Sequence, residues 1–205
     1  VTADLPTLAV RMPANPVAQD ILRSFGGPIA APSANPSGKI SPTSVDHVVA
    51  GLSGRIEAVV DGGDCDVGLE STIVGLFDTP TLLRPGGLPR EALEAALGDE
   101  MDVHSAADPL VAPGQMTSHY APGAAVRLNA TDVGDGEVLL GFGNVDCTLN
   151  LSPSGDLREA AANLFHHLHA LDAMNADGIA VSPIPNHGLG VAINDRLKRA
   201  AAPRD

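Results

Sequence analysis

The sequence predicts an open α/β sheet, and three observations support this prediction. Short aliphatic segments alternate with longer amphipathic ones, as in residues 136–143, 156–174 and 178–185. This strand–helix–strand order is typical of open α/β folds. Hydrophobic residues make up 44% of the chain but aromatic residues only 2%, so Ala, Val, Leu and Ile must fill the core.

The first part of the chain is expected to begin with a strand, a helix and a second strand. Residues 8–12 and 28–31 are short and aliphatic, which favours strands. Between them, Asn15 is a suitable N-cap for a helix that Gly26 would end. The later elements of this part are expected as a helix from Ser41 or Thr43, strands at 55–63, 71–77 and 81–87, and a helix at 89–98.

Residues 99–124 differ from the rest because they contain several prolines and no sustained hydrophobic period. They are predicted to form a linker, or a loop that covers an active site. After this connector the alternation resumes, with strands expected at 124–130, 136–143 and 178–185 and helices at 156–174 and 190–202.

Composition and charge limit the classes of function. A net charge of −13 and a pI of about 4.7 argue against a body that grips nucleic acid through a basic surface. No apolar run approaches the roughly 18 residues of a membrane span, and no signal-peptide pattern is present. Cys65 and Cys147 give no disulfide framework, so a reduced, cytosolic state is the simpler interpretation. The chain opens on Val1 close to a predicted strand, and we expect it to be the later part of a longer protein.

A polar loop in front of a predicted helix is the first candidate site. Ser33, Asn35, Ser37, Ser41 and Thr43 could all donate or accept hydrogen bonds there. Amide groups at the start of the helix would point to the same place, which predicts an anion cradle. An ordinary capped turn uses the same residue types, so that alternative stays open.

Four further residues carry side chains suited to small charged ligands. Glu70 could orient an ammonium group or a metal-bound water and Ser71 could bind a carboxylate, unless both lie at a solvated strand end. Arg84 could pair with phosphate or carboxylate through two nitrogen atoms, or it could be a surface arginine. Arg11 lies among apolar neighbours and therefore needs a charged partner from the protein or a ligand.

Three weaker candidates lie elsewhere. Tyr120 could contact a ligand beneath the connector or simply anchor this loop. His166 and His169 share a helix face, but a metal site would need a third ligand and a supporting carboxylate, so a surface or interface role is the simpler interpretation. Cys65 could be a nucleophile or a small buried residue.

Six motifs taken together are more specific than any one of them. The stretches "VRMP", "APSANPSGKISPT", "DGG", "GLESTIV", "LLRPG" and "HYAPG" occur in this order along the chain. They resemble the threonylcarbamoyl-adenylate synthase family, whose catalytic domain is called YrdC-like. The resemblance implies the C-terminal part of a YrdC-like twisted mixed-sheet domain at residues 1–98, a linker over the active site at 99–124, and a small Rossmann-like α/β domain at 125–205.

The resemblance also implies a reaction. The family condenses L-threonine, bicarbonate and ATP into threonylcarbamoyl-AMP and releases pyrophosphate, with Mg2+ accompanying ATP. Other proteins, a tRNA-modifying transferase complex in the cytoplasm, then transfer the threonylcarbamoyl group to an adenosine of certain tRNAs. The implied role of the protein is to position the substrates and neutralise their charge.

Nine residues match positions that bind substrate in the family. The resemblance assigns no catalytic side chain and no metal ligand. It implies that ATP is bound by Thr7, Ser33, Asn35, Ser41, Arg84 and Tyr120, and that L-threonine is bound by Arg11, Ala31 and Ser71.

The sequence departs from the family pattern at two places. The Lys/Arg motif that grips the triphosphate normally precedes "VRMP" and is not present, so we expect this polypeptide not to make the adenylate efficiently alone. The basic residue often found just before "HYAP" is also missing.

Other functions compete with this one. A YrdC-like module that binds RNA or regulates without catalysis is one alternative, which the acidic charge and the scarcity of aromatic residues oppose. A different carbamoyltransferase and a stand-alone nucleotide-binding protein are the others.

Overall fold

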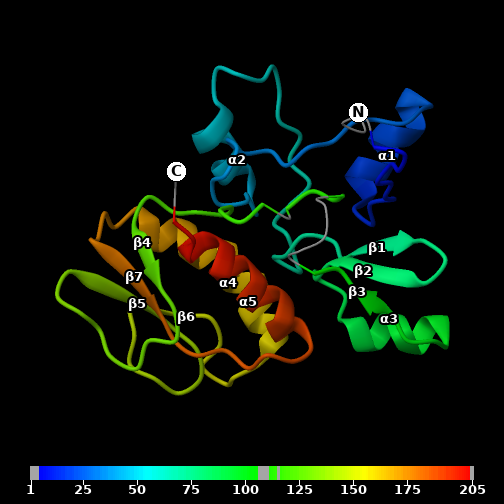
Figure 1. Cartoon of the computed structure of the whole chain (residues 1–205). Helices are drawn as coiled ribbons and strands as arrows, with labels where there is room; N and C mark the ends of the chain where they lie inside the picture. Colours follow the sequence, from blue (N-terminus) through cyan, green and yellow to red (C-terminus); the bar gives the residue numbers. More distant parts are fainter. Residues whose placement is uncertain (1–4, 106–110, 115, 204–205) are drawn as a thin grey trace.

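The computed structural model describes residues 5–105, 111–114 and 116–203. It contains a three-stranded sheet of order β1-β2-β3 and a four-stranded sheet of order β4-β7-β5-β6. Figure 1 shows the two sheets on opposite sides of the molecule, with the connector running between them. This arrangement confirms the predicted α/β fold class.

The first two helices lie before the first sheet. Helix α1 spans Pro16–Phe25 and begins as predicted, because the Asn15 side chain accepts a hydrogen bond from the Ala18 amide at 3.2 Å. Helix α2 spans Val45–Leu52, and its N-cap is Ser44 rather than Ser41 or Thr43. The expected start was therefore early, and Ser41 is free to make long-range contacts instead.

Three segments predicted as strands are not strands in the structure. Residues 8–12, 28–31 and 55–63 follow irregular paths, and Val10 and Met12 are 84% and 87% exposed. A β-branched, aliphatic sequence favours an extended backbone, but a strand forms only where a neighbouring strand pairs with it. Among the residues that the structure describes, none pairs with these segments.

The first sheet is built around a hairpin. Strands β1 (Ile73–Leu76) and β2 (Pro80–Arg84) are antiparallel, as expected, with Ile73 opposite Arg84. Helix α3 (Arg90–Leu97) ends at Gly98, whose φ of 75° suits glycine. A short strand β3 (Asp102–Val103) pairs parallel to β2 inside the segment that was predicted to hold no regular structure. Residues 106–110 and 115 of that connector lie outside the described residues.

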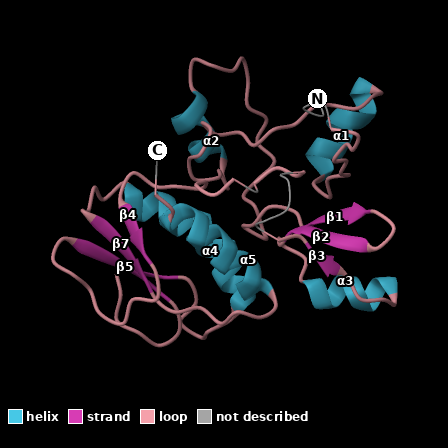
Figure 2. Cartoon of the chain, in the orientation of Figure 1, coloured by secondary structure: helices cyan, strands magenta, loops and turns pink. Residues whose placement is uncertain are grey.

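The second sheet is entirely parallel and carries most of the core. Its strands are β4 (Ala125–Arg127), β5 (Glu137–Gly141), β6 (Leu149–Asn150) and β7 (Gly178–Val181). Helices α4 (Leu157–Asp172) and α5 (Leu189–Ala201) lie together beside it, on the side that faces the rest of the molecule (Figure 2). No helix in the described part of the chain is long and apolar enough to cross a membrane.

The core of the second sheet includes residues that precede this sheet in the chain. Ile40 and Tyr120 belong to this core, and Leu69 packs against it. Gly68 approaches the backbone of α4 so closely that an added Cβ would lie 2.3 Å from the carbonyl oxygen of Ala161. These contacts bring the segments around residues 40 and 70 against α4 and α5, where the candidate site is built.

Candidate functional site

Four of the predicted ligand residues meet at one junction of the fold. Ser41 follows an isolated bridge between Lys39 and the connector, and Ser71 begins the segment that leads into β1. Arg84 ends β2, and Tyr120 lies in the connector. The junction is closed on its other side by α5, which supplies a residue that the sequence analysis missed.

That residue is Arg196. Its side chain is 0% exposed, and its Nε donates to the Glu70 carboxylate at 2.9 Å. The other carboxylate oxygen of Glu70 accepts a hydrogen bond from the Ser41 hydroxyl at 2.6 Å. Glu70 therefore joins a predicted ligand residue to helix α5.

The environment of Glu70 keeps it ionised. Burial alone would raise the pKa of this carboxyl, but the Arg196 guanidinium and the hydrogen bonds from Ser41 and Arg196 outweigh that effect and lower its pKa. A carboxylate that receives charge-assisted hydrogen bonds on both oxygens is held in one orientation.

Arg84 is buried and ties three segments together. Its Nη2 donates to the carbonyl of Ser71 at 2.8 Å, and its Nη1 donates to the carbonyl of Pro113 at 3.1 Å. Burial, followed by the nearby charge of Arg196, lowers the pKa of Arg84. Within the described part of the chain its buried Nε has no hydrogen-bond partner. This is the nitrogen that remains for an anion once the main chain has used the other two.

Tyr120 is an anchor of the connector. Only 1% of it is exposed, and its ring lies beneath the Arg196 guanidinium, 5.3 Å from the guanidinium carbon to the ring centroid. Its backbone has a positive φ of 60°, which is unusual for a residue other than glycine. Burial raises the pKa of its hydroxyl, and among the described residues this oxygen has no hydrogen-bond partner.

The other predicted ligand residues make no hydrogen bond to this junction in the described part of the chain. Asn35 folds its own loop by donating to the carbonyls of Pro36 at 2.9 Å and Lys39 at 3.1 Å. The structure thus brings together Ser41, Ser71, Arg84 and Tyr120. Exposed positions on irregular segments are occupied by Thr7, Arg11, Ala31 and Ser33.

The sequence contains a feature that predicts the burial of Arg196. Arg196 falls on the same helical stripe as Ile193, Leu197 and Ala200, all of which are buried in α5. An arginine on the apolar stripe of an amphipathic helix needs a buried partner. The sequence could therefore have flagged Arg196, although it could not have identified Glu70 as its partner.

His166 and His169 of α4 lie against His47 of α2, in agreement with the surface or interface role expected for them. The rings of His47 on α2 and His169 on α4 stack with centroids 3.9 Å apart, and the His166 ring lies 5.6 Å from that of His47. His169 Nε2 lies 3.1 Å from the carbonyl oxygen of Ser41. Within the described ranges, no group of three or more His, Cys, Asp or Glu side chains could hold a metal ion.

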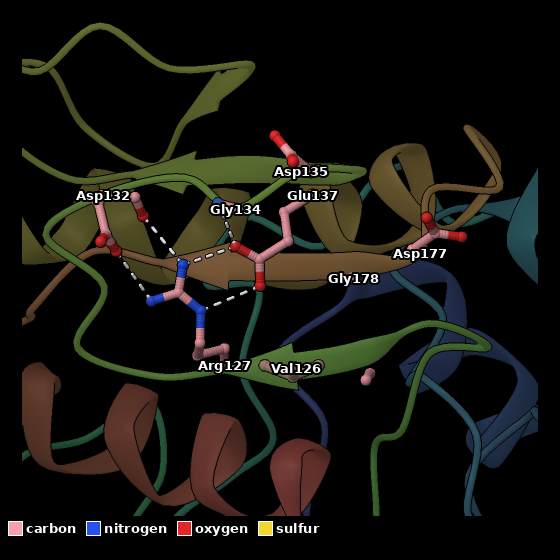
Figure 3. A pocket seen from close by; sticks show the side chains of 9 residues that line it. Val126, Arg127, Asp132, Gly134, Asp135, Glu137, Asp177 and Gly178 are labelled. Carbon is pink, nitrogen blue, oxygen red and sulfur yellow. Dashed lines mark hydrogen bonds and ion pairs between the residues drawn. The ribbon is translucent and has the colours of Figure 1, made fainter.

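A hollow of about 620 Å³ lies elsewhere, where β4, β5 and β7 begin. Figure 3 shows Arg127 at its centre, with Glu137 and Asp132 turned toward the guanidinium. Arg127 donates to Glu137 at 2.6 Å and to Asp132 at 3.1 Å. The hydrogen bond from Arg127, followed by that from the Gly134 amide, lowers the pKa of Glu137 to about 2. Arg127 is paired with Glu137 and Asp132, Asp135 and Asp177 also line this hollow, and none of the predicted ligand residues does.

Comparison with known proteins covers the whole chain. A family model described as "Telomere recombination" matches residues 1–86, and one described as "Threonylcarbamoyl-AMP synthase, C-terminal domain" matches residues 88–202. Threonylcarbamoyl-AMP synthases from Pyrococcus abyssi and Bacillus subtilis are 38% and 36% identical to it over 100% of the chain. The chain spans 66% of the length of each of these two relatives.

A solved structure agrees with the sequence comparison. The crystal structure of P. abyssi Sua5 complexed with L-threonine is similar with a TM-score of 0.87 at 37% identity, over 98% of this chain and 65% of that one. The similarity thus includes both sheets and the connector between them. The chain belongs to the threonylcarbamoyl-AMP synthase family.

Proposed function

We propose that this chain carries the substrate-binding junction of an L-threonylcarbamoyladenylate synthase, which condenses L-threonine, bicarbonate and ATP into threonylcarbamoyl-AMP and pyrophosphate. The observation that carries the proposal is the convergence of Ser41, Ser71, Arg84 and Tyr120 at one junction, although they are distant in sequence. Membership of the family and the similarity to a relative solved with L-threonine support it.

The proposed chemistry asks the protein to position substrates. The threonine amine adds to CO2 derived from bicarbonate and loses a proton, which gives a carbamate. A carbamate oxygen then attacks the α-phosphorus of ATP, the bond to the bridging oxygen breaks, and pyrophosphate leaves. Negative charge accumulates on the phosphate oxygens, so fixed cationic donors nearby lower the barrier.

The residues of the junction have complementary roles in this proposal. Arg84 offers its Nε to an anionic oxygen while its other donors fix the start of β1 and the connector. In this proposal Ser71, at the start of the segment that leads into β1, contacts L-threonine. Ser41 contacts the nucleotide. The remaining residues of the proposed sites are Thr7, Ser33 and Asn35 for ATP, and Arg11 and Ala31 for L-threonine.

Within the described part of the chain, no set of side chains fits a bound metal ion. The described residues offer no suitable cluster of carboxylates, histidines or cysteines. In the proposal Mg2+ is only the counter-ion of ATP. The product would pass to a tRNA-modifying transferase complex in the cytoplasm, and the acidic charge of this chain disfavours its own binding of tRNA.

The division into a catalytic part at 1–98, a linker at 99–124 and a second domain at 125–205 remains part of the proposal. In it, the connector and the second domain form one wall of the ligand junction. The contacts of Glu70 and Tyr120 with α5 support this arrangement.

A binding experiment tests the proposed function. The melting temperature of the chain should rise with ATP, and L-threonine with bicarbonate should raise it further only when ATP is present, because both substrates share one junction. Incubation with 14C-threonine, bicarbonate and ATP should give little labelled adenylate on chromatography, because this polypeptide is not expected to make it efficiently alone. A melting temperature that ATP shifts identically with and without L-threonine would favour a plain nucleotide-binding protein instead.

A further inference from the structure

The hydroxyl of Ser41 has a fixed polarity. A carboxylate has no proton to give, so in the contact between Ser41 Oγ and Glu70 the serine must donate. A hydroxyl carries a single proton and two lone pairs. Once the proton is directed at Glu70, Ser41 can only accept hydrogen bonds from anything else that it meets.

Arg196 maintains this polarity from the other side of Glu70. Its Nε holds one carboxylate oxygen at 2.9 Å, and its Nη1 donates to Asp195 at 2.8 Å. The guanidinium is fully buried and lies over the Tyr120 ring. It therefore has no freedom to swing away, and it keeps Glu70 both ionised and oriented toward Ser41.

The backbone of Ser41 is fixed by the same domain. Its carbonyl oxygen lies 3.1 Å from Nε2 of His169, a residue of α4. Helices α4 and α5 thus hold the main chain and, through Glu70, the side chain of one residue that lies more than a hundred positions earlier.

The unpartnered groups of the junction have the opposite polarity. Among the described residues, Arg84 Nε and Arg196 Nη2 are buried donors without a partner, and the Tyr120 hydroxyl is also unpaired. Guanidinium donors suit phosphate or carboxylate oxygens. The Ser41 oxygen has only lone pairs left for a ligand. It would repel phosphate or carboxylate oxygens and can accept a hydrogen bond from an N–H or O–H group.

We propose that Arg196 is a positioning residue for the nucleotide site. By holding Glu70, it keeps the Ser41 hydroxyl proton directed at the Glu70 carboxylate. Ser41 then accepts a hydrogen bond from an amino or hydroxyl group of the nucleotide. This inference rests on the proposed function, because it takes Ser41 to be a nucleotide contact. It revises the expected role of Ser41 from binding an anion to recognising a donor. In a nucleotide, the adenine amino group and the two ribose hydroxyls are the donors available.

Calorimetric titration of the full chain with four nucleotides tests the inference, since the chain contains no tryptophan for fluorescence. The ligands are ATP, inosine triphosphate, which lacks the amino group, and 2′-deoxy- and 3′-deoxy-ATP, which each lack one hydroxyl. One of the three analogues should bind about tenfold more weakly than ATP, as expected for one lost hydrogen bond. Its identity tells which donor Ser41 recognises.

Four variants separate positioning from a general loss of structure. Arg196→Met should remove the tenfold preference, and Arg196→Lys should retain part of it because a charged donor remains for Glu70. Ser41→Ala should abolish the preference while leaving the Glu70–Arg196 pair in place. Lys198→Met removes a charge from an exposed position of the same helix and should leave the preference unchanged.

Each outcome bears on the inference. If Arg196→Met or Ser41→Ala binds all four nucleotides with the same preferences as the parent chain, the inference about Arg196 and Ser41 is wrong. The proposed nucleotide site is not contradicted by that result. If Arg196→Met does not unfold cooperatively, the nucleotide preferences of Arg196→Lys and Ser41→Ala test the inference instead. A parent chain that binds no ATP at millimolar concentration would overturn the proposed function, and this inference with it.

Discussion

The first half of the molecule carries helices α1, α2 and α3, and the second half carries α4 and α5. The two halves contain similar local sequence patterns but bury them very differently. Helices α1, α2 and α3 contain no buried residue, whereas α4 and α5 each bury six. Large apolar side chains such as Val10 and Phe25 are exposed in the first half, while Leu164 and Ile193 are 0% exposed in the second. Capping and periodicity therefore define helices in both halves, but only the second half places them on a sheet that excludes water.

The candidate site lies where the well-packed half holds the other. Ser41 and Glu70 belong by sequence to the first half, yet their contacts run to α4 and α5. The well-packed half thus serves as a rigid support, and the loops that it holds carry the chemistry. Variants that act on one half and not on the other should show this difference directly.

The largest difference is expected for truncation of apolar side chains. Leu164→Ala should lower the free energy of unfolding by about 3 kcal/mol, because it opens a cavity in the core beside the second sheet. Val10→Ala should change it by less than about 0.5 kcal/mol, since Val10 already lies in water. Urea titrations followed by circular dichroism measure both values. Equal losses for the two variants would show that the first half packs far better than its exposed side chains indicate.

Two glycines provide the next test, at the contact between the halves. Gly63 and Gly68 both have positive φ, 82° and 70°, but an added Cβ meets nothing within 4 Å at Gly63 and lies 2.3 Å from the Ala161 oxygen at Gly68. Gly63→Ala should cost about 1 kcal/mol for backbone strain alone. Gly68→Ala should cost about 2–3 kcal/mol and should speed amide exchange from residues 68–76, because it pushes this segment off α4. An identical cost for both would remove the evidence for close packing at this contact.

Helix caps distinguish local from global stability. Asp156 accepts hydrogen bonds from the Arg158 and Glu159 amides at the start of α4. Asp156→Ala should therefore lower the free energy of unfolding by about 1 kcal/mol. The Asn15 cap of α1 is chemically similar, yet Asn15→Ala should leave the global unfolding midpoint unchanged and only speed amide exchange in α1, because that helix has no buried residue. A fall in the global midpoint for Asn15→Ala would place α1 in the same cooperative unit as the core.

The sequence determined the elements whose signals are local. Asn15, Gly26 and Gly98 make the helix caps with their own side chain or backbone, so these helix ends were predicted correctly. The strands expected at 8–12 and 55–63 were not found, because strand formation depends on a partner that local sequence does not specify.

The candidate site was only partly accessible for the same reason. Residue types suited to anions could be recognised, and the family resemblance located them. The link from Ser41 through Glu70 to Arg196 spans 126 residues between its last two members, and no local pattern encodes such a contact. The polarity of Ser41, and hence the kind of group that it can bind, became apparent only with that link.

The smallest expected effect concerns pH and the histidines between the halves. Burial, followed by the charges of His169 and His166, lowers the pKa of His47 below its usual 6.5, although Asp46 and Asp64 act in the opposite direction. Burial also lowers the pKa of His169, against the opposing effects of the Ser41 carbonyl and Asp172. Both rings are therefore more readily protonated in the unfolded chain than in the folded one.

The sign of the pH dependence follows from that difference. Below pH 6.5 the unfolded chain binds more protons than the folded chain, so stability falls as the pH drops through the folded pKa values. The melting temperature should thus decrease from about pH 7.5 to about pH 5.5, and His47→Asn should reduce this decrease by removing one of the stacked rings. His187→Asn, at an exposed loop position, should leave the decrease unchanged. A decrease that is the same in His47→Asn as in the parent would mean that protonation of this stack does not loosen the contact between the halves.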